Sequence, residues 1–506
     1  MSSVESSGPA VALSAHDLTE AYQLMVYNCE DCAPASESWD TAEFASANAT
    51  PTVEDHRQWV RGGEVTEVDV DPQHRVLFNP VSSGGVVVLN EAAFGIYQRF
   101  ARPVAMVDAM SWPGEGTTRT ILRLGQTGII YPVGQPARPQ FRDSKVLTAW
   151  LHVTNACNLR CPYCYVNKSA EKMEDSTGLA AVEAVIGSTL NHGFEAVKLK
   201  YAGGEASLNQ QLMIRMHDHA EALTRRHGLG LRATLLSNGV RLPTALVDVL
   251  KQKNIRVMIS LDGVGKTHDA QRPFVNGKPS FRHVERTVTQ LMEQGHPPHL
   301  SVTITDRNVA HLSETVRFAM DRGLTFSFNF FRDNACAEIL PQLRYREQDM
   351  IVAILGAFDV IEEYLPPWSV LGSILDRGQL LQPRQRSCGV GQDYVVIDQR
   401  GQVAKCHMEI ERTLGDIFTA DPLALVMRDR STALNLIADE KEGCRDCTWR
   451  YWCSGGCSVA TFRATGRYDI KSPNCNIYQA IYPPALRLEG LRLLKHGTGG
   501  PRGYRS

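Results

Sequence analysis

The sequence predicts an α/β protein built on a partial, open (β/α)6 barrel. Three observations lead to this expectation. Strand-like runs alternate with amphipathic helical stretches in the middle of the chain, cysteines gather at two places, and 506 residues suffice for about three domains. Strands that alternate with helices form βα units and a parallel sheet. Six such units are fewer than the eight of a complete barrel, so the barrel is expected to be open.

The barrel is expected over residues 145–340. Its strand-like runs are Val146–Thr154, Ala196–Tyr201, Leu231–Ser237, Arg256–Asp262, His299–Thr305 and Thr325–Phe331. The helical stretches between them are Thr177–His192, Asn209–His227, Pro243–Lys253, Arg282–Gln294 and Val309–Arg322. A bridging segment, 341–385, is expected to hold two helices, Glu347–Tyr364 and Val370–Leu381. Reactive side chains of such a fold belong at the carboxyl ends of the strands.

Before the barrel, residues 61–140 have the size and pattern of a small winged-helix-like α+β domain. Two strand-like runs flank Ser82–Gly85 and predict a hairpin, and a helix is expected at Glu91–Phe100. The hairpin strands are Arg75–Asn79 and Val86–Leu89. The following segment, 133–144, reads as a linker because it contains Pro136 and Pro139. Residues 1–60, which carry ten acidic residues and one Arg, are expected to be partly disordered.

The composition is that of a folded protein, with 43% hydrophobic and 21% charged residues. A net charge of −2 gives no argument for a nucleic acid or a membrane surface as partner. No apolar run is long enough for a membrane span, and the N-terminus lacks the basic start of a signal peptide, so a cytoplasmic location is expected. The acidic N-terminus and the basic tail, 481–506, are expected to be solvated ends. The 13 cysteines then read as metal or redox ligands rather than disulfides.

Three of these cysteines follow the first barrel strand at a C-x3-C-x2-C spacing: Cys157, Cys161 and Cys164. Three thiolates on one loop can bind three irons of a [4Fe–4S] cluster and leave the fourth iron open to a small molecule. An electron-transfer ferredoxin would close that position with a fourth cysteine. The alternative is a three-cysteine zinc site, but no fourth ligand follows at zinc-finger distance.

Further motifs stand at the ends of the next strands. Gly203-Gly204-Glu205 follows the second strand, Ser237-Asn238-Gly239 the third, and Ser260-Leu261-Asp262-Gly263 the fourth. With the cysteine loop they resemble the radical S-adenosylmethionine (radical SAM) enzymes. The resemblance implies that S-adenosylmethionine binds the open iron and is cleaved to a 5′-deoxyadenosyl radical. The residues expected to contact this cofactor are Tyr163, Gly203, Gly204, Glu205, Ser237, Asn238, Ser260 and Arg272.

The resemblance also implies roles within this set. The two glycines are expected to admit the cofactor's amino group close to the backbone. The guanidinium of Arg272, in His268-Asp269-x-x-Arg272, is expected to hold its carboxylate.

A second cysteine constellation occupies residues 386–480. Its seven members are Cys388, Cys406, Cys444, Cys447, Cys453, Cys457 and Cys475. Seven cysteines are too many for one tetrahedral zinc, and two zinc sites need eight ligands. The spacing resembles the SPASM extension of radical SAM enzymes, which carries two auxiliary [4Fe–4S] clusters. The expected total is therefore three clusters.

The same resemblance divides the seven cysteines. Cys388, Cys406 and Cys457 would hold one auxiliary cluster, and Cys444, Cys447, Cys453 and Cys475 the other. One iron of the first auxiliary cluster then lacks an assigned ligand, because 382–387 contains no cysteine. Of the remaining three cysteines, Cys29 and Cys32 are expected to be an incidental surface pair. Cys336 is expected to face the barrel mouth as a buried residue without function.

The SPASM resemblance implies a peptide or protein substrate and an external electron donor such as flavodoxin or ferredoxin. The segment 61–140 resembles the RiPP recognition element, which binds a leader peptide as an added strand. A generic α+β cap is the alternative for that segment. The leading hypothesis is a maturase that abstracts a hydrogen from a ribosomally made precursor peptide and forms a thioether or carbon–carbon crosslink.

Two alternatives stay open. An anaerobic sulfatase-maturing enzyme would oxidise Cys or Ser to formylglycine. Such enzymes place an Asp directly after the Gly-x4-Cys cysteine, where this chain has His407, a residue able to act as a base near neutral pH. The alternative role of His407 is that of a histidine outside the reaction. A non-catalytic iron–sulfur or zinc-binding protein is the hypothesis from another class.

Overall fold

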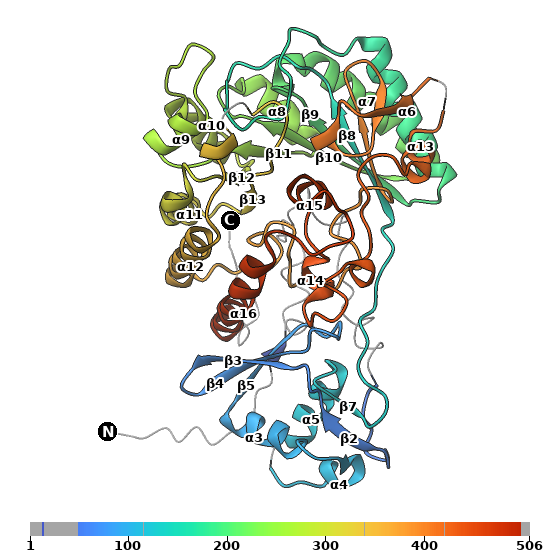
Figure 1. Cartoon of the computed structure of the whole chain (residues 1–506), viewed down its shortest axis with the longest axis vertical. Helices are drawn as coiled ribbons and strands as arrows, with labels where there is room; N and C mark the ends of the chain where they lie inside the picture. Colours follow the sequence, from blue (N-terminus) through green and yellow to red (C-terminus); the bar gives the residue numbers. More distant parts are fainter. Residues whose placement is uncertain (1–12, 15–48, 115, 338–339, 419, 497–506) are drawn as a thin grey trace.

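The computed structural model of the chain describes residues 13–14, 49–114, 116–337, 340–418 and 420–496. Three parts follow one another along its long axis (Figure 1). The barrel lies at one end, the N-terminal domain at the other, and helices of the C-terminal segment lie between them. In the part of the chain so described, no helix is both long and apolar enough to cross a bilayer.

A nine-stranded sheet forms the barrel, in the order β13-β12-β11-β10-β9-β8-β14-β15-β16. The first six of these strands pair in parallel, which confirms the α/β expectation and places their carboxyl ends at one edge. Their bounds are β8 Val146–His152, β9 Ala196–Ala202, β10 Gly230–Ser237, β11 Ile255–Ser260, β12 His299–Ile304 and β13 Phe326–Phe330.

Helices cover the outer face of this sheet. Their bounds are α6 Asp175–Asn191, α7 Gln210–His227, α8 Thr244–Gln252, α9 Lys266–Gln271, α10 Phe281–Glu293, α11 Leu312–Asp321 and α12 Glu347–Tyr364. Because side chains alternate along a strand, Leu147, Ala149 and Leu151 of β8 join the main core that includes the helices. The short helix α9 was not expected from the sequence.

The opposite, inner face of the sheet packs against the C-terminal segment. Trp150 and Ala202 on this face share a small core with Cys406, Ile410 and Val459. This contact brings the second cysteine constellation to the barrel interior.

The cysteine-rich segment itself supplies three strands of the sheet, a feature that the sequence did not predict. These are β14 Tyr394–Ile397, β15 Gln402–Ala404 and β16 Thr413–Asp416. Strand β14 pairs in parallel with β8, with Tyr394 opposite Thr148 and Val396 opposite Trp150. The helices of the segment are α13 Pro422–Arg428, α14 Arg450–Cys453, α15 Ser458–Thr465 and α16 Cys475–His496.

The N-terminal domain contains two small antiparallel sheets, β1-β5-β4-β3 and β6-β2-β7. Its elements are β1 Leu13–Ser14, β2 Gln58–Arg61, β3 Thr66–Asp71, β4 His74–Phe78, β5 Val86–Asn90, α3 Glu91–Arg99, β6 Val104–Ala105, α4 Met106–Met110, α5 Thr117–Gln126 and β7 Ile130–Pro132. The predicted hairpin is confirmed as β4 and β5, in antiparallel pairing. Asn90 caps α3, since its side chain accepts a hydrogen bond from the amide of Ala93 over 2.9 Å.

Residues 58–60, at the end of the segment expected to be partly disordered, belong to β2. The expectation of a solvated C-terminal tail is wrong where the structure describes that tail. Residues 481–496 belong to α16 and bury Ile481 and Leu486, so this part of the basic tail is not a solvated end. Cys29 and Cys32 lie outside the described residues.

The helix predicted at Val370–Leu381 is also wrong. The segment forms turns whose apolar side chains, such as Ile374 and Leu375, are fully buried. Pro366 and Pro367 precede it, and Gly378 packs so closely that a Cβ there would lie 2.7 Å from the hydroxyl of Tyr482. The apolar spacing therefore reflects burial on several sides rather than one helix face.

Candidate active site

The loop that carries Cys157, Cys161 and Cys164 leaves the carboxyl end of β8. Its backbone is fixed on both sides: the amide of Arg160 donates to the carbonyl of Pro273 over 2.8 Å, and the ammonium of Lys168 donates to the carbonyl of Leu159 over 2.7 Å. The Leu159 side chain is fully buried and anchors the loop. The three thiols are therefore held on a preorganised turn.

Hydrogen-bond donors and cations surround these thiols. The Sγ of Cys157 accepts from the amide of Leu159 over 3.4 Å and from the side-chain amide of Asn238 over 3.8 Å. Burial raises the pKa of all three thiols, and the Lys168 cation opposes that shift at each. Arg272 opposes it at Cys161 and Cys164 as well.

This donor set fits an iron–sulfur cluster. Among the described residues, no three Cys, His, Asp or Glu side chains form a group suited to one metal ion. The thiolates of a cubane cluster bind different irons, so they need not converge on one point. Donors to the sulfur atoms and nearby cations stabilise the negative charge that such a cluster carries.

Gly203 and Gly204 follow β9 and touch the cysteine loop. A Cβ at Gly203 would lie 2.3 Å from the carbonyl oxygen of Thr154, and one at Gly204 would lie 2.5 Å from that of Ala156. The amide of Gly204 donates to Thr154 over 2.7 Å. The backbone of the cysteine loop thus fills the space next to these two glycines. This close packing is a reason for glycine at both positions that the sequence did not reveal. Their contact with a cofactor stays a prediction.

Glu205 connects the ends of β9 and β10. Its buried carboxylate accepts from the hydroxyl of Ser237 over 2.9 Å and from the amides of Asn238 and Ser207 over 2.6 and 3.1 Å. The Asn238 side chain in turn donates to that of Asn158 over 2.7 Å, as well as to Cys157. The structure therefore brings three predicted site residues into one network beneath the cysteine loop.

Tyr163, Asp262 and Arg272 form a second buried network. The guanidinium of Arg272 donates to Asp262 over 3.2 Å and to the hydroxyl of Tyr163, which itself donates to Asp262. The Nε of Arg272 is buried without a hydrogen-bond partner in the described part of the chain. An unsatisfied cationic donor beside Cys161 fits the expected carboxylate of an amino-acid cofactor. Ser260 ends the neighbouring strand β11 and is half-buried.

His407 lies on the inner face of the sheet. Its ring stacks on Trp150 with the ring centroids 4.5 Å apart and the planes 14° apart. The hydroxyl of Tyr394 is hydrogen-bonded to its Nδ1 over 2.9 Å, and the ring of Tyr165 lies 5.6 Å away. An aromatic cage therefore orients this imidazole next to Cys406.

The seven C-terminal cysteines fall into two sets of electrostatic neighbours. The thiolates of Cys388 and Cys457 contribute to a pKa of about 12 at Cys406, whose largest cause is burial. Burial, with Cys453, Cys475 and Cys447, raises the pKa of Cys444 to about 12. These neighbours coincide with the division that the resemblance implies, and the binding of a cluster by either set stays a prediction.

Side-chain amides donate hydrogen bonds to cysteine sulfurs of both sets. The amide of Asn435 donates to the Sγ of Cys388 over 3.5 Å and to its carbonyl oxygen over 2.6 Å. The amide of Gln479 donates to the Sγ atoms of Cys447 and Cys475 over 3.9 and 3.7 Å. No local pattern of the sequence indicates Asn435, which meets Cys388 only through the fold, whereas Gln479 follows Cys475 by one turn of α16 and Lys168 follows Cys164 by four residues.

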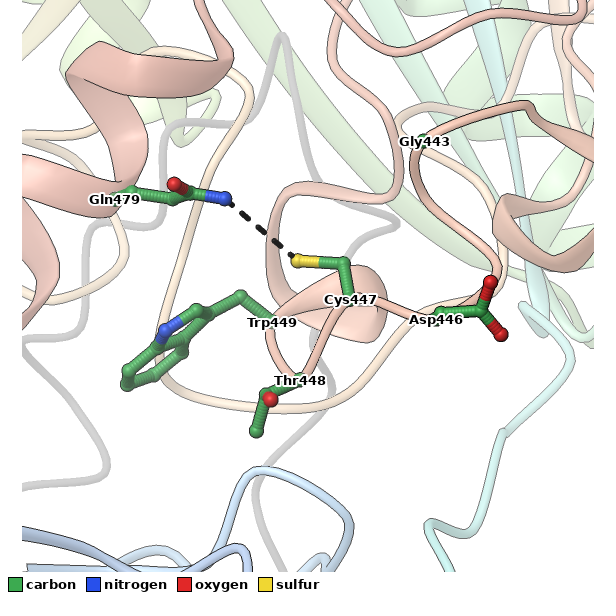
Figure 2. A pocket seen from close by; sticks show the side chains of 6 residues that line it. All are labelled: Gly443, Asp446, Cys447, Thr448, Trp449 and Gln479. Atoms are coloured by element: carbon green, nitrogen blue, oxygen red, sulfur yellow. Dashed lines mark hydrogen bonds between the residues drawn. The ribbon is translucent and has the colours of Figure 1, made fainter.

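An open pocket of about 530 Å³ adjoins Cys447. Figure 2 shows the amide of Gln479 directed across it toward the Cys447 sulfur, with Trp449 and Thr448 along the same wall. The second thiol set therefore reaches close to the molecular surface. Cys336 is exposed, so its expected burial is wrong.

Comparisons with known proteins agree with this geometry. Residues 151–319 match the model of the radical SAM superfamily. The mycofactocin maturase MftC of Mycobacterium tuberculosis is 25% identical over 364 residues, which cover 69% of this chain and 86% of that protein. A cysteine-type anaerobic sulfatase-maturating enzyme of Clostridium perfringens is 21% identical over 326 residues, which cover 60% of this chain and 86% of that protein.

A solved structure, native anSMEcpe with bound AdoMet and Cp18Cys peptide, has the same fold. The TM-score is 0.57 at 19% identity, over 69% of this chain and 99% of that chain. The family implies S-adenosylmethionine and a [4Fe–4S] cluster, and the match sets aside a non-catalytic binding protein. The matched domain, with its cysteine loop and strand-end motifs, places this chain in the radical SAM superfamily, and it is a radical SAM enzyme.

Proposed function

We propose that this enzyme is a peptide maturase that abstracts a hydrogen from a ribosomally made precursor peptide and installs a thioether or carbon–carbon crosslink. The observation that carries the proposal is the packing of the cysteine-rich segment on the inner face of the barrel. There Cys406 and His407 lie against Trp150. Crosslinking is an oxidation, and this arrangement puts a redox-capable segment beside the expected reaction chamber.

The proposal includes three [4Fe–4S] clusters. Cys157, Cys161 and Cys164 would hold the first and leave one iron for S-adenosylmethionine. The two sets of C-terminal thiols would hold the auxiliary clusters, and their electrostatic grouping supports this assignment. Asn238, Asn435 and Gln479 would donate hydrogen bonds to ligand sulfurs of the three sites.

S-adenosylmethionine, when bound and reduced, supplies a 5′-deoxyadenosyl radical. The peptide gives up one hydrogen atom to that radical, then joins the resulting carbon radical to a second residue. This second step releases a proton and one electron, so the peptide loses two hydrogens overall. A flavodoxin or ferredoxin is the class of carrier that we expect to exchange electrons with the protein. His407, held by Trp150 and Tyr394, would accept the proton.

The precursor would dock on the N-terminal sheet as an added strand. In the sheet order β1-β5-β4-β3, the outer neighbour of β5 is the two-residue strand β1, Leu13–Ser14, which pairs with it in antiparallel fashion. A leader peptide would take the same position, through main-chain hydrogen bonds. Removal of residues 1–48 should then raise the affinity for a leader peptide, as measured by fluorescence anisotropy. If the domain is only a structural cap, neither the full chain nor the shortened chain will bind the leader.

Formylglycine formation is the second candidate function. The similarity to a sulfatase-maturating enzyme favours it, whereas His407 in place of the usual Asp counts against it. A base held on the inner face next to Cys406 occupies the sequence position where sulfatase-maturing enzymes have an Asp. The same base would serve the deprotonation of a substrate Cys or Ser.

One experiment separates the two reactions. The reconstituted enzyme is incubated anaerobically with S-adenosylmethionine, a reductant and peptides encoded by short reading frames next to its gene, and the peptides are analysed by mass spectrometry. A loss of two hydrogens without a reactive carbonyl supports the crosslink. An aldehyde trapped by a hydrazide supports formylglycine. Cleavage of S-adenosylmethionine with every tested peptide unchanged would contradict the maturase proposal for those substrates.

A further inference from the structure

Lys441 is a lysine buried within the cysteine-rich segment. Its exposed fraction is 1%, and lysines are almost never fully buried unless their charge is paired. The carbonyl oxygen of Lys441 accepts from the amide of Cys444 over 3.1 Å. Its ammonium donates to the carbonyl oxygen of Ser454, which directly follows Cys453, over 3.0 Å. The residue therefore spans the distance between two cysteine-bearing loops.

Gly455 makes room for this side chain. A Cβ at position 455 would lie 2.5 Å from the Cδ of Lys441 and 2.7 Å from its Nζ. Gly455 also has a φ of +73°, a conformation that side-chain-bearing residues rarely adopt. The backbone at Gly455 therefore packs closely against the side chain of Lys441 and fixes the position of its ammonium.

Both thiol sets act on this ammonium. Burial lowers the pKa of Lys441, whereas the thiolates of Cys444 and Cys453 in one set, and of Cys388 and Cys457 in the other, raise it. Ser454, whose carbonyl oxygen accepts the hydrogen bond of this ammonium, stands between Cys453 of one set and Cys457 of the other, so the ammonium is held at the segment that joins the two sets.

We propose that Lys441 is a positioning residue that sets the reduction potentials of both auxiliary clusters through one shared cation. The inference rests on the cluster assignment in the proposed function. A cluster becomes more negative when it is reduced, so a nearby cation stabilises the reduced form and raises the potential. Because the ammonium is buried, solvent and salt screen this attraction only weakly.

The test compares Lys441→Met, which removes the charge, with Lys441→Arg, which keeps it. Arg445→Met is the matched control, since it removes an exposed cation next to Cys444. Midpoint potentials of the auxiliary clusters are measured by redox titration with electron paramagnetic resonance in the reconstituted full-length protein. We expect Lys441→Met to lower both midpoint potentials by about 59 mV or more. For a one-electron couple this shift is a tenfold change in the equilibrium constant of reduction. Lys441→Arg should keep both potentials close to their wild-type values, and Arg445→Met should leave both potentials unchanged.

Iron content separates the possible failures. About 12 irons in the wild type with unchanged potentials in Lys441→Met would overturn the inference alone, whereas about four irons would overturn the cluster assignment and the inference with it. A shift in only one cluster would contradict the shared role. If Lys441→Met and Lys441→Gln both fail to hold auxiliary iron while Lys441→Arg holds it, the requirement for a cation is supported. Loss of iron in Lys441→Arg as well would assign the residue to packing and overturn the proposal.

Discussion

The indole N–H of Trp452 donates a hydrogen bond to the carbonyl oxygen of Pro80 over 2.8 Å, across 372 positions of the chain. Next to this bond the ring of Phe78 meets Trp452 edge-on at 4.7 Å and stacks on Trp449 at 5.7 Å. The N-terminal sheet and the cysteine-rich segment therefore share part of one apolar core. The Pro-containing linker before the barrel does not make the N-terminal domain an independent module.

Replacing Phe78 by Ala should therefore destabilise the whole protein. The side chain is fully buried, and truncation of a buried Phe costs about 3–5 kcal/mol in the free energy of unfolding. Denaturant unfolding followed by fluorescence measures the change. Val275→Ala is the control, because Val275 is 58% exposed and its change should stay within about 0.5 kcal/mol. Equal stability of the two variants would refute the shared core.

Replacing Cys157, Cys161 and Cys164 together by Ala should remove the cluster that we propose at this loop and spare the two that we propose at the C-terminal thiols. About two-thirds of the iron should remain, since the C-terminal thiols are untouched, and cleavage of S-adenosylmethionine should be abolished. Iron is measured by colorimetric assay and 5′-deoxyadenosine by chromatography. Complete loss of iron in this variant would mean that the two constellations are not separate sites.

Replacing His407 by Gln should uncouple the cleavage of S-adenosylmethionine from the modification of the peptide. The cysteine loop is unchanged, so 5′-deoxyadenosine should still form, whereas modified peptide should fall by about 100-fold or more if the imidazole is the base. Tyr394→Phe removes the hydroxyl at Nδ1 and should give a smaller loss. Unimpaired peptide modification by His407→Gln would assign the residue to packing on Trp150.

Stability should fall on acidification because of His268. Burial and the Arg272 cation lower the pKa of this imidazole to about 3, against about 6.5 in the unfolded chain. Between these values the unfolded state binds the additional proton, so the free energy of unfolding decreases as pH falls, by at most about 1.4 kcal/mol per pH unit for this group. Denaturant unfolding between about pH 5 and pH 7.5 should show a shallower slope in His268→Gln. The exposed His227→Gln is the control and should keep the wild-type slope.

The sequence predicts the barrel well because its signals are local. Each of the six strands is one short run rich in apolar residues, even where polar residues alternate with them as Lys198 and Lys200 do in β9, and each motif stands directly at a strand end. The spacing of Cys157, Cys161 and Cys164 needs no tertiary information either. By contrast, β15 has three residues and β14 has four, too few for a periodic signal, and β14 finds its partner β8 only in the folded chain.

Helix α16 was missed because Pro483 and Pro484 stand inside it, where proline removes a backbone hydrogen bond. Tertiary packing of Ile481 and Leu486 outweighs that cost in the structure. The hydrogen-bond partner of Cys388 was hidden for another reason. Asn435 contacts Cys388 from 47 positions away, and nothing in its neighbourhood marks it as a donor to sulfur.

The pairing of β8 with β14 has a consequence for biosynthesis. When the ribosome has completed the six parallel strands, β8 still lacks its neighbour, and its outer edge exposes a row of unpaired amides and carbonyls. That edge stays open until residue 397 has emerged, because the pairing runs from Tyr394 opposite Thr148 to Ile397 opposite Leu151. A nascent chain halted in this interval presents a template for intermolecular strand addition. The cysteine-rich segment thus acts during synthesis as a protective edge for the barrel.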